Sequence, residues 1–222
     1  MAWRQVILPV TIGNDIVDLS IAAQKHAHER FLNRVFTSNE KSLIASHVDK
    51  HCLLWALWAA KEAAFKAYQK QQLDYVFSPV EAEVIVPSDL VFDWSAGLEG
   101  EVIIRGHPIT CRWYLIKRQS RLAIHCVAHY PAQTSLITSL KVEYVESCDE
   151  YKALSQKTRQ LALSLCREKG LHNVSIERPP LDLKAYTKFG PPILMHNGIR
   201  LPHELSLSHD GHFLAVTLGQ KT

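Results

Sequence analysis

Apolar residues that recur with a helical period predict three helices along the chain. The longest covers roughly 50–71, where Leu, Trp, Ala and Phe residues form one wide face and lysines lie on the other. A shorter helix is expected near 39–46, because Ser38 and Glu40 are typical of a helix start. In the second half, the same period predicts a helix over 148–169.

Stretches rich in Val, Ile, Leu and Thr, separated by Gly and Pro, predict strands around these helices. Residues 5–19 are expected to be extended, although Asn14 and Asp15 place two polar groups inside this apolar segment. The other expected strands are 84–86, 101–104, 110–117, 122–129, 140–145, 174–177, 205–208 and 213–218. Helices and short strands in this order predict an α+β fold.

The order of elements repeats in outline on either side of residues 131–135, which we interpret as a joint. In each half a strand precedes a long helix, and further strands follow it. The pattern predicts a pseudo-dimer of two similar α+β lobes, 1–131 and 136–222, each a long helix packed on a small antiparallel sheet. Two α+β halves that resemble each other by chance are the alternative.

The composition favours a folded protein that interacts with an anionic ligand or an acidic protein. The chain has 222 residues, 47% of them hydrophobic, which is enough for one large core or two small ones. Its net charge of +3 is too small to indicate nucleic-acid binding. Five scattered cysteines, none in a C-x-x-C pair, support neither a zinc knuckle nor a disulfide framework.

Signals for secretion or membrane insertion are not recognisable in the sequence. The first residues lack the apolar core and cleavage site of a signal peptide. No stretch reaches the roughly 18 uncharged apolar residues of a membrane span. We therefore expect a cytoplasmic protein that binds neither a membrane nor nucleic acid.

Asp15, Glu62 and Lys66 are the residues whose chemistry stands out. Glu62 and Lys66 lie one helical turn apart, a spacing that commonly gives an exposed ion pair. Asp15 lies in an apolar segment, where a carboxylate caps a turn, pairs with a base or is costly to bury. A divalent cation shared by Asp15 and Glu62 would satisfy both carboxylates, and Mg²⁺ accepts such ligands together with phosphate oxygens and water.

Five short motifs of this chain form an ordered set. G-N-D-I at 13–16 and W-A-A-K-E-A-A-F-K at 58–66 flank R-F-L-N-R-V-F-T-S-N-E at 30–40. G-P-P-I-L at 190–194 and S-L-S-H-D-G at 206–211 follow near the end. The set resembles the G-x-D-I, W-x-x-K-E-A-x-x-K, G-K-P-x-L and S-x-S-H-x-G motifs of 4′-phosphopantetheinyl transferases. The segment 30–40 is similar to the R-F-x-x-R-V-x-T-x-x-E stretch of holo-acyl-carrier-protein synthases within that family.

The resemblance implies an enzyme that transfers the 4′-phosphopantetheine arm of coenzyme A to a serine of an apo carrier protein and releases 3′,5′-ADP. It implies that Asp15 and Glu62 bind Mg²⁺, that Glu62 takes the serine proton, and that Lys66 neutralises phosphate charge. His209 is expected to contact the phosphates, with Ser208 fixing the turn beside it. The residues that the resemblance assigns to coenzyme A are His209, Ser208, Lys184, Lys188 and Lys61.

Two positions depart from the family pattern. Two-lobed members usually carry another acid two residues after the metal-binding Asp, and here that position is Val17. Asp18 is the next acid, but the alternation of side chains along a strand directs it away from Asp15. The lysine of the G-K-P motif is replaced by Pro191. Candidates for the missing phosphate contact are Lys184 and Lys188.

The order of the motifs implies two lobes in swapped order. In the large family members the metal-binding motifs belong to the C-terminal lobe, whereas here they come first. Small single-lobe members also begin with these motifs, but they are much shorter and form trimers. We therefore expect a monomer that completes one site between its own lobes. Arg30 and Arg34 either bind an acidic carrier protein or are solvated charges.

Other functions stay open on the sequence alone. A Mg²⁺-dependent phosphohydrolase would use the same two carboxylates, and a non-catalytic module would bind coenzyme A or a carrier protein without turnover. Zinc is not expected, because the pair His125 and His129 and the pair His26 and His28 each lack a third ligand. The acceptor is equally open among fatty-acid, polyketide, peptide-synthetase and glycolipid carriers.

Overall fold

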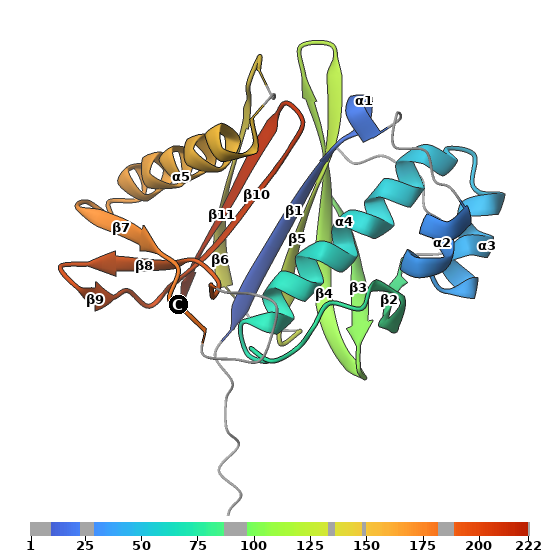
Figure 1. Cartoon of the computed structure of the whole chain (residues 1–222), viewed down its shortest axis with the longest axis horizontal. Helices are drawn as coiled ribbons and strands as arrows, with labels where there is room; N and C mark the ends of the chain where they lie inside the picture. Colours follow the sequence, from blue (N-terminus) through green and yellow to red (C-terminus); the bar gives the residue numbers. More distant parts are fainter. Residues whose placement is uncertain are drawn as a thin grey trace, which may run out of the picture.

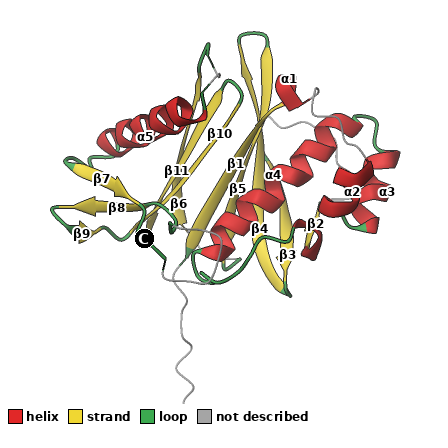
Figure 2. Ribbon diagram, in the orientation of Figure 1, coloured by secondary structure: helices red, strands yellow, loops and turns green. Residues whose placement is uncertain are grey.

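Two long helices pack on antiparallel sheets in the fold of this protein (Figures 1 and 2). The computed structural model describes residues 10–22, 29–86, 97–132, 136–147, 150–181 and 189–221. Within these residues the chain forms a five-stranded sheet and two three-stranded sheets. The prediction of an α+β fold is confirmed.

The five-stranded sheet comes from the first half of the chain, in the order β1-β5-β4-β3-β2. Its strands are β1 (Thr11–Asp18), β2 (Ala82–Ile85), β3 (Leu98–Ile104), β4 (His107–Arg118) and β5 (Arg121–Tyr130). Helix α4 (Lys50–Gln69) crosses one face of this sheet (Figure 1). The shorter helices of this half are α1 (Leu19–Ala22), α2 (Glu29–Val35), α3 (Ser38–Ser46) and the 3-10 helix η1 (Pro79–Glu81).

The second half of the chain forms the two smaller sheets and helix α5 (Tyr151–Glu168). One sheet has the order β10-β11-β6, with β6 (Leu136–Tyr144), β10 (His203–Asp210) and β11 (Phe213–Lys221). The other has the order β7-β8-β9, with β7 (Val174–Glu177), β8 (Ile193–His196) and β9 (Ile199–Arg200). Helix α5 packs against β11, β10 and β7.

The sequence predicts the long elements and the short strands β2 and β7, but it misses several other short elements. It does not predict α1, α2, β8 or β9, because elements of 4, 7, 4 and 2 residues are too short to show a period. Helix α3 is capped by Thr37 rather than by Ser38. The Thr37 hydroxyl accepts a hydrogen bond from the Glu40 backbone N–H, and the Glu40 carboxylate accepts one from the Thr37 backbone N–H.

Each half of the chain has its own apolar core, and a smaller cluster lies between them. The first core draws its buried residues from 17–130, and the second from 145–218. Ile16, Ala123, Phe213 and Ala215 form the third cluster, which joins the two halves. In each half the first strand pairs with the last, and the last with the strand before it. Whether the halves are equivalent lobes stays a prediction.

Gly13 allows β1 to lie directly against α4. A Cβ atom at this position would lie 1.9 Å from the Ala63 carbonyl oxygen and 2.7 Å from the Ala67 backbone nitrogen. Both neighbours are helix backbone, which cannot move aside as a side chain does. Next to this contact, the Thr11 hydroxyl donates to the Ala67 carbonyl oxygen at 2.8 Å. The glycine thus brings Asp15, two residues further along β1, close to α4.

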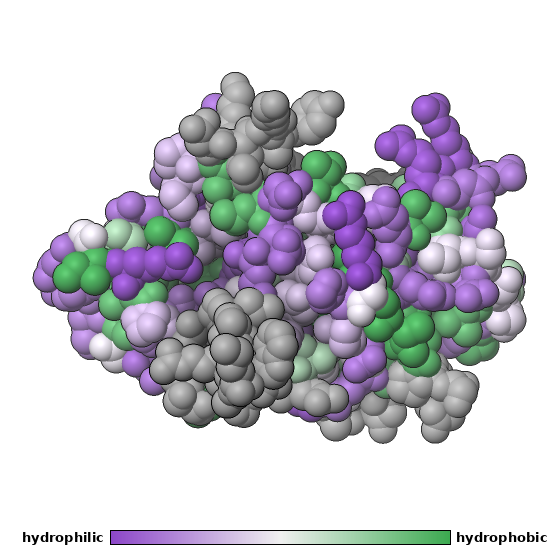
Figure 3. All heavy atoms as spheres, turned by 90° about the horizontal axis from the view of Figure 1, so that it is seen from below, coloured by the Kyte–Doolittle hydropathy of each residue, from purple (hydrophilic) through white to green (hydrophobic). Residues whose placement is uncertain are grey.

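Polar and apolar residues are interspersed on the face of the molecule that Figure 3 shows from below. Among the described residues, the most exposed large hydrophobic side chains, Val48 at 96% and Tyr151 at 76%, come from different halves of the chain. No helix in the described part of the chain combines the length and the apolar character that crossing a membrane requires.

A buried histidine is expected to make the fold sensitive to acid. His125 is 1% exposed, and its Nε2 lies 3.2 Å from Asn14 Nδ2. Burial, with a smaller contribution from Lys66, lowers the pKa of His125 to about 3. The unfolded chain binds this proton near pH 6.5. The contribution of His125 to stability is therefore complete above pH 6.5 and is lost as the pH falls from 6.5 toward 3.

We predict that at pH 5 this single group lowers the free energy of unfolding by about 2 kcal/mol relative to pH 7.5. Urea unfolding at both pH values should show that His125→Gln loses about 2 kcal/mol less unfolding free energy on acidification than wild type does. His172→Gln, at an exposed position, is the control and should behave as wild type. Equal acid sensitivity in wild type and His125→Gln would contradict the prediction.

Candidate active site

Strands β1 and β10 meet edge to edge where the two halves of the chain join (Figure 1). Three side chains of β10 accept hydrogen bonds from alternate backbone N–H groups of β1. The bonds run from Asn14 N to Ser206 Oγ (2.8 Å), from Ile16 N to Ser208 Oγ (3.1 Å) and from Asp18 N to Asp210 Oδ2 (3.0 Å). The S-x-S-H segment thus fixes the register between β10 and the strand that carries Asp15.

Asp15 is held from both halves of the chain. Its Oδ1 accepts hydrogen bonds from Lys66 Nζ at 2.8 Å and from Ser208 Oγ at 2.9 Å. Among the described residues, no donor contacts its Oδ2, which is left to bind another partner. Burial alone would lower the pKa of Lys66, but Asp15 and Glu62 outweigh burial and the pKa is raised. Lys66 is therefore a firmly charged group between two carboxylates.

Glu62 faces Asp15 from α4. Burial, together with the negative charge of Asp15, raises the pKa of Glu62 to about 7, and Lys66 opposes the shift. Two carboxylates that repel each other across the contact of β1 with α4 form a pair suited to a cation. A carboxylate with a pKa near 7 is also suited to act as a general base at neutral pH.

Two adjoining hollows meet at Asp15 and His209, which line both of them. The smaller, of about 190 Å³, contains Glu62 and is walled by Trp55 and Trp58. The larger, of about 300 Å³, lies between the two halves of the chain. His209 therefore stands at the passage between the carboxylate pair and the larger hollow.

Tyr151, the first residue of α5, packs against His209. The two rings meet edge to face with their centroids 4.9 Å apart. Burial and the charge of Lys66 lower the pKa of His209, while Asp210 and Asp15 oppose the shift. A lowered pKa keeps the imidazole neutral near pH 7 until a nearby anion stabilises the charged form.

The larger hollow is basic. Lys66 reaches it from α4 and Lys70 from the position directly after α4, and Arg159 and Arg178 reach it from the second half of the chain. Lys70 is neutralised by Glu204 at 3.0 Å, whereas neither guanidinium has a carboxylate partner among the described residues. Burial, followed by the neighbouring charge of Arg159, lowers the pKa of Arg178. Two cations that lack a carboxylate partner suit an anionic ligand.

The G-P-P segment also lies at this hollow, since Pro191 and Pro192 line it. Arg178 Nε donates to the carbonyl oxygen of Gly190 at 2.8 Å, so its guanidinium is tied to the position before Pro191. None of the sequence motifs includes Arg159, Arg178 or Tyr151. Single residues outside any motif give no signal in the sequence, because only the packing of the two halves brings them to the site.

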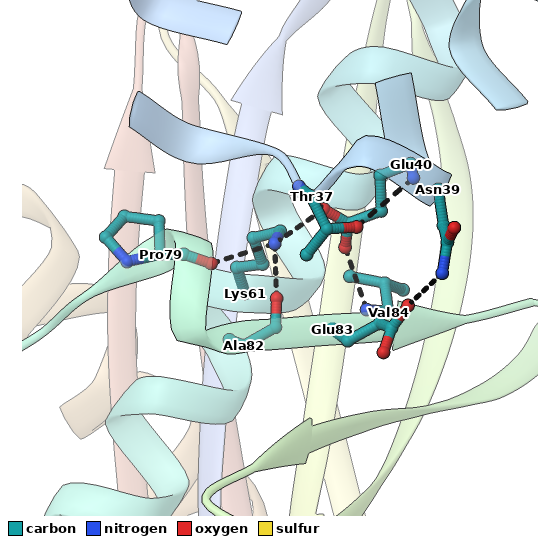
Figure 4. Close-up of polar contacts among 8 residues, drawn as sticks. All are labelled: Thr37, Asn39, Glu40, Lys61, Pro79, Ala82, Glu83 and Val84. Carbon is teal, nitrogen blue, oxygen red and sulfur yellow. Dashed lines mark hydrogen bonds and ion pairs between the residues drawn. The ribbon is translucent and has the colours of Figure 1, made fainter. Parts of the chain in front are cut away.

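Lys61, which the resemblance assigns to coenzyme A, lines neither hollow of this site. Its side chain is fully buried, and its ammonium lies 2.8 Å from Glu40 Oε2 (Figure 4). The same ammonium donates to the carbonyl oxygens of Pro79, at 2.8 Å, and of Ala82. All three of its protons are therefore used inside the protein.

Ser208 lies inside the strand expected over 205–208. It lies within β10 and not in a turn, and its hydroxyl both accepts from β1 and donates to Asp15. Asp18 points away from Asp15, as predicted: its carboxylate accepts from the backbone N–H groups of Ser20 and His212. Val17, in place of a further acid, lines the smaller hollow beside Asp15.

Arg30 and Arg34 line neither hollow. Lys184 and Lys188 lie outside the described residues. Arg30 and Arg34 are exposed on α2, one helical turn apart.

The described residues fit a hard divalent cation that takes only part of its ligands from the protein. They contain no group of three or more His, Cys, Asp or Glu side chains that could hold a metal ion. The donors at hand are the carboxylates of Asp15 and Glu62. Mg²⁺ binds in this way, through one or two carboxylates, with phosphate oxygens and water as the other ligands.

Comparison with known proteins identifies the family. The family model of the 4′-phosphopantetheinyl transferase superfamily matches residues 11–126, more than half of the chain. The chain belongs to this superfamily, as the motifs predict.

The curated relatives are longer proteins, and the chain matches only a part of each. Over 61 residues, 28% of this chain, it is 43% identical to "Fatty acid synthase alpha subunit hexA" of Dothistroma septosporum, of which the match covers 18%. A protein of the same name from strain NZE10 / CBS 128990 is also 43% identical over 61 residues, and the match covers 4% of it. The chain thus matches less than a fifth of either relative.

Proposed function

We propose that this protein transfers the 4′-phosphopantetheine arm of coenzyme A to a serine of an apo carrier protein in a Mg²⁺-dependent reaction and releases 3′,5′-ADP. The observation that carries the proposal is the meeting of Asp15, Glu62 and Lys66 with Ser208 and His209 across the β1–β10 contact. Carboxylates for a cation lie there beside a basic hollow of about 300 Å³.

Asp15 and Glu62 would hold the Mg²⁺ ion, which when bound withdraws charge from the diphosphate of coenzyme A. Ser208 and Lys66 orient Asp15 through its Oδ1, which leaves Oδ2 toward the cation. Glu62 takes the proton of the carrier serine, directly or through a water molecule. Lys66 stabilises the leaving 3′,5′-ADP as negative charge develops on it, and His209 contacts the phosphates of bound coenzyme A.

Arg159 and Arg178 extend this site toward the rest of coenzyme A. Both are cations without a carboxylate partner among the described residues, and Arg178 is tied to Gly190. Arg178 thereby supplies the positive charge that the family's G-K-P lysine would bring where this chain has Pro191. Lys184 and Lys188 remain further candidates for the same role.

The acceptor is proposed to be an acidic carrier protein. Its docking would involve Arg30 and Arg34, exposed on α2. Similarity to a fatty acid synthase subunit makes a carrier of fatty-acid synthesis the first acceptor to test. We place the protein in the cytoplasm.

The direct test incubates the purified protein with coenzyme A, Mg²⁺ and apo carrier protein, and follows the carrier by intact mass. A mass gain equal to phosphopantetheine, dependent on Mg²⁺, is expected. Phosphate release without a mass gain would instead indicate a phosphohydrolase. Binding of coenzyme A or carrier without either product would indicate a non-catalytic module.

We predict that the protein is active as a monomer with residues 1–131 and 136–222 acting as two lobes. Asp15 receives its hydrogen bonds from α4 and β10 of the same chain, so one copy supplies the whole site. Light scattering during an activity measurement should give a mass near 25.2 kDa. An active trimer that loses activity on dissociation would contradict this.

His209 and Lys66 should affect different steps of the reaction. His209→Ala should raise the KM for coenzyme A about ten- to a hundredfold, since a charge-assisted phosphate contact contributes about 1.5–3 kcal/mol. Lys66→Ala should mainly lower kcat, because its charge matters most as the diphosphate leaves. Steady-state kinetics with His172→Ala as an exposed control separates the two effects. An unchanged KM in His209→Ala would remove His209 from the site.

A further inference from the structure

The Glu40–Lys61 ion pair is buried on the β2 side of α4, away from the site (Figure 4). The two side chains are 2% and 0% exposed. Glu40 Oε1 accepts from the Val84 backbone N–H at 2.8 Å, and Oε2 from that of Thr37 at 2.8 Å. One carboxylate thus ties together the start of α3, strand β2 and helix α4.

Lys61 completes this network. Its ammonium binds Glu40 and two carbonyl oxygens at the junction of η1 and β2, and it lies 5.7 Å from the centre of the Phe36 ring. Burial lowers the pKa of Lys61, and Glu40 opposes the shift. Every donor and acceptor in the pair has a specific partner, so the geometry of α4 against β2 is narrowly defined.

Helix α4 is consequently held at both edges of the five-stranded sheet. At the β1 edge, Lys66 contacts Asp15 and the helix backbone abuts Gly13. At the β2 edge, the Lys61 ammonium donates to the carbonyl oxygens of Pro79 and Ala82. β1 and β2 are the outermost strands of this sheet. Two attachments on opposite sides prevent rotation of the helix about its axis, and Glu62 directly follows Lys61 in the sequence.

A buried ion pair is a weak source of stability, because desolvation offsets most of the attraction between the charges. Its removal as a pair is often tolerated, whereas loss of one partner leaves an uncompensated charge. The pair is therefore better explained by the geometry that it imposes. We propose that Glu40 and Lys61 are positioning residues that fix the rotation of α4 and so direct the Glu62 carboxylate toward Asp15. This inference rests on the proposed function.

The test replaces both charges in Glu40→Gln/Lys61→Met and compares the variant with wild type. Calorimetry with Mn²⁺ in the presence of coenzyme A should show a dissociation constant raised about tenfold. Transfer should show kcat lowered about ten- to a hundredfold, as a misplacement of about 1 Å can produce. The KM for coenzyme A should change less than threefold, because the basic hollow is intact. Glu81→Gln, which removes an exposed ion pair between η1 and Arg105, is the control. It should change neither the dissociation constant of Mn²⁺ nor kcat.

A second variant keeps the test valid if the double variant does not fold. Lys61→Arg retains the charge and the partner, but its wider guanidinium displaces α4 from β2, so the same loss of kcat is expected. Circular dichroism and thermal unfolding establish which variants are native. If neither variant folds, the pair is required by the fold itself and the positioning role is overturned.

The outcomes separate this inference from the proposed function. If the wild-type protein transfers phosphopantetheine and a folded variant keeps the same Mn²⁺ affinity and kcat, the positioning role alone is overturned. Wild-type Mn²⁺ binding that weakens in the variant supports positioning even where no carrier is modified. A wild-type chain that neither binds Mn²⁺ nor transfers overturns the proposed function, and this inference with it.

Discussion

Asp15→Ala and Glu62→Ala should each lower phosphopantetheine transfer by roughly two to three powers of ten or more while the protein stays folded. The two carboxylates face each other from β1 and α4, and the described residues contain no group of three or more His, Cys, Asp or Glu side chains that could hold a metal ion. Removal of either leaves a single protein ligand for the cation. The measurement is the rate at which the apo carrier gains mass at saturating coenzyme A.

The two variants should differ in stability, which gives an internal check. Glu62 is half-buried and repelled by Asp15, so Glu62→Ala removes an unfavourable charge and should not lower the melting temperature. Asp15→Ala deprives Lys66 and Ser208 of their acceptor, so a modest loss is expected. Glu101→Ala, at an exposed position on β3, is the matched control. Near-wild-type transfer by either site variant at ordinary Mg²⁺ concentration would eliminate the metal-site assignment.

Glu62, Lys66 and Lys61 show how far a helical pattern leads and where it stops. Each residue of a helix turns by about 100°, so Glu62 and Lys66 lie on one side and Lys61 about 140° from Lys66. The motif correctly places the first two beside Asp15. It also suggests that all lysines of the helix share its polar face, and this fails for Lys61. Its acceptors come from α3, which precedes α4, and from the junction of η1 and β2, which follows it.

The second half of the chain shows a different limit. The segment 206–211 predicts that His209 belongs to the site, but not that Ser206, Ser208 and Asp210 accept from the backbone of β1. Arg159 and Arg178 reach the larger hollow only through the packing of the two halves. The periodicity of apolar residues predicts each helix or strand separately. It does not predict contacts between elements that are distant in sequence unless a motif marks the residues.

Gly13→Ala should destabilise the protein by about 3 kcal/mol or more, at the upper end of what an added methyl group costs in a packed core. The new Cβ would lie 1.9 Å from the Ala63 carbonyl oxygen, so β1 must move away from α4. For a chain of this length, that loss lowers the melting temperature by roughly 6–12 °C. Transfer by any protein that remains folded should also fall, because the same movement separates Asp15 from Lys66 and Glu62.

Gly106→Ala is the matched glycine control for this prediction. Gly106 has a φ of +80° and no atom within 4 Å of an added Cβ, so it measures backbone strain without a steric clash. That strain costs about 1–2 kcal/mol. The melting temperature should therefore be highest for wild type, lower for Gly106→Ala and lowest for Gly13→Ala. Transfer should be reduced only in Gly13→Ala. If Gly13→Ala has the same melting temperature as Gly106→Ala and retains full transfer, β1 does not depend on close contact with α4 to hold Asp15 in place.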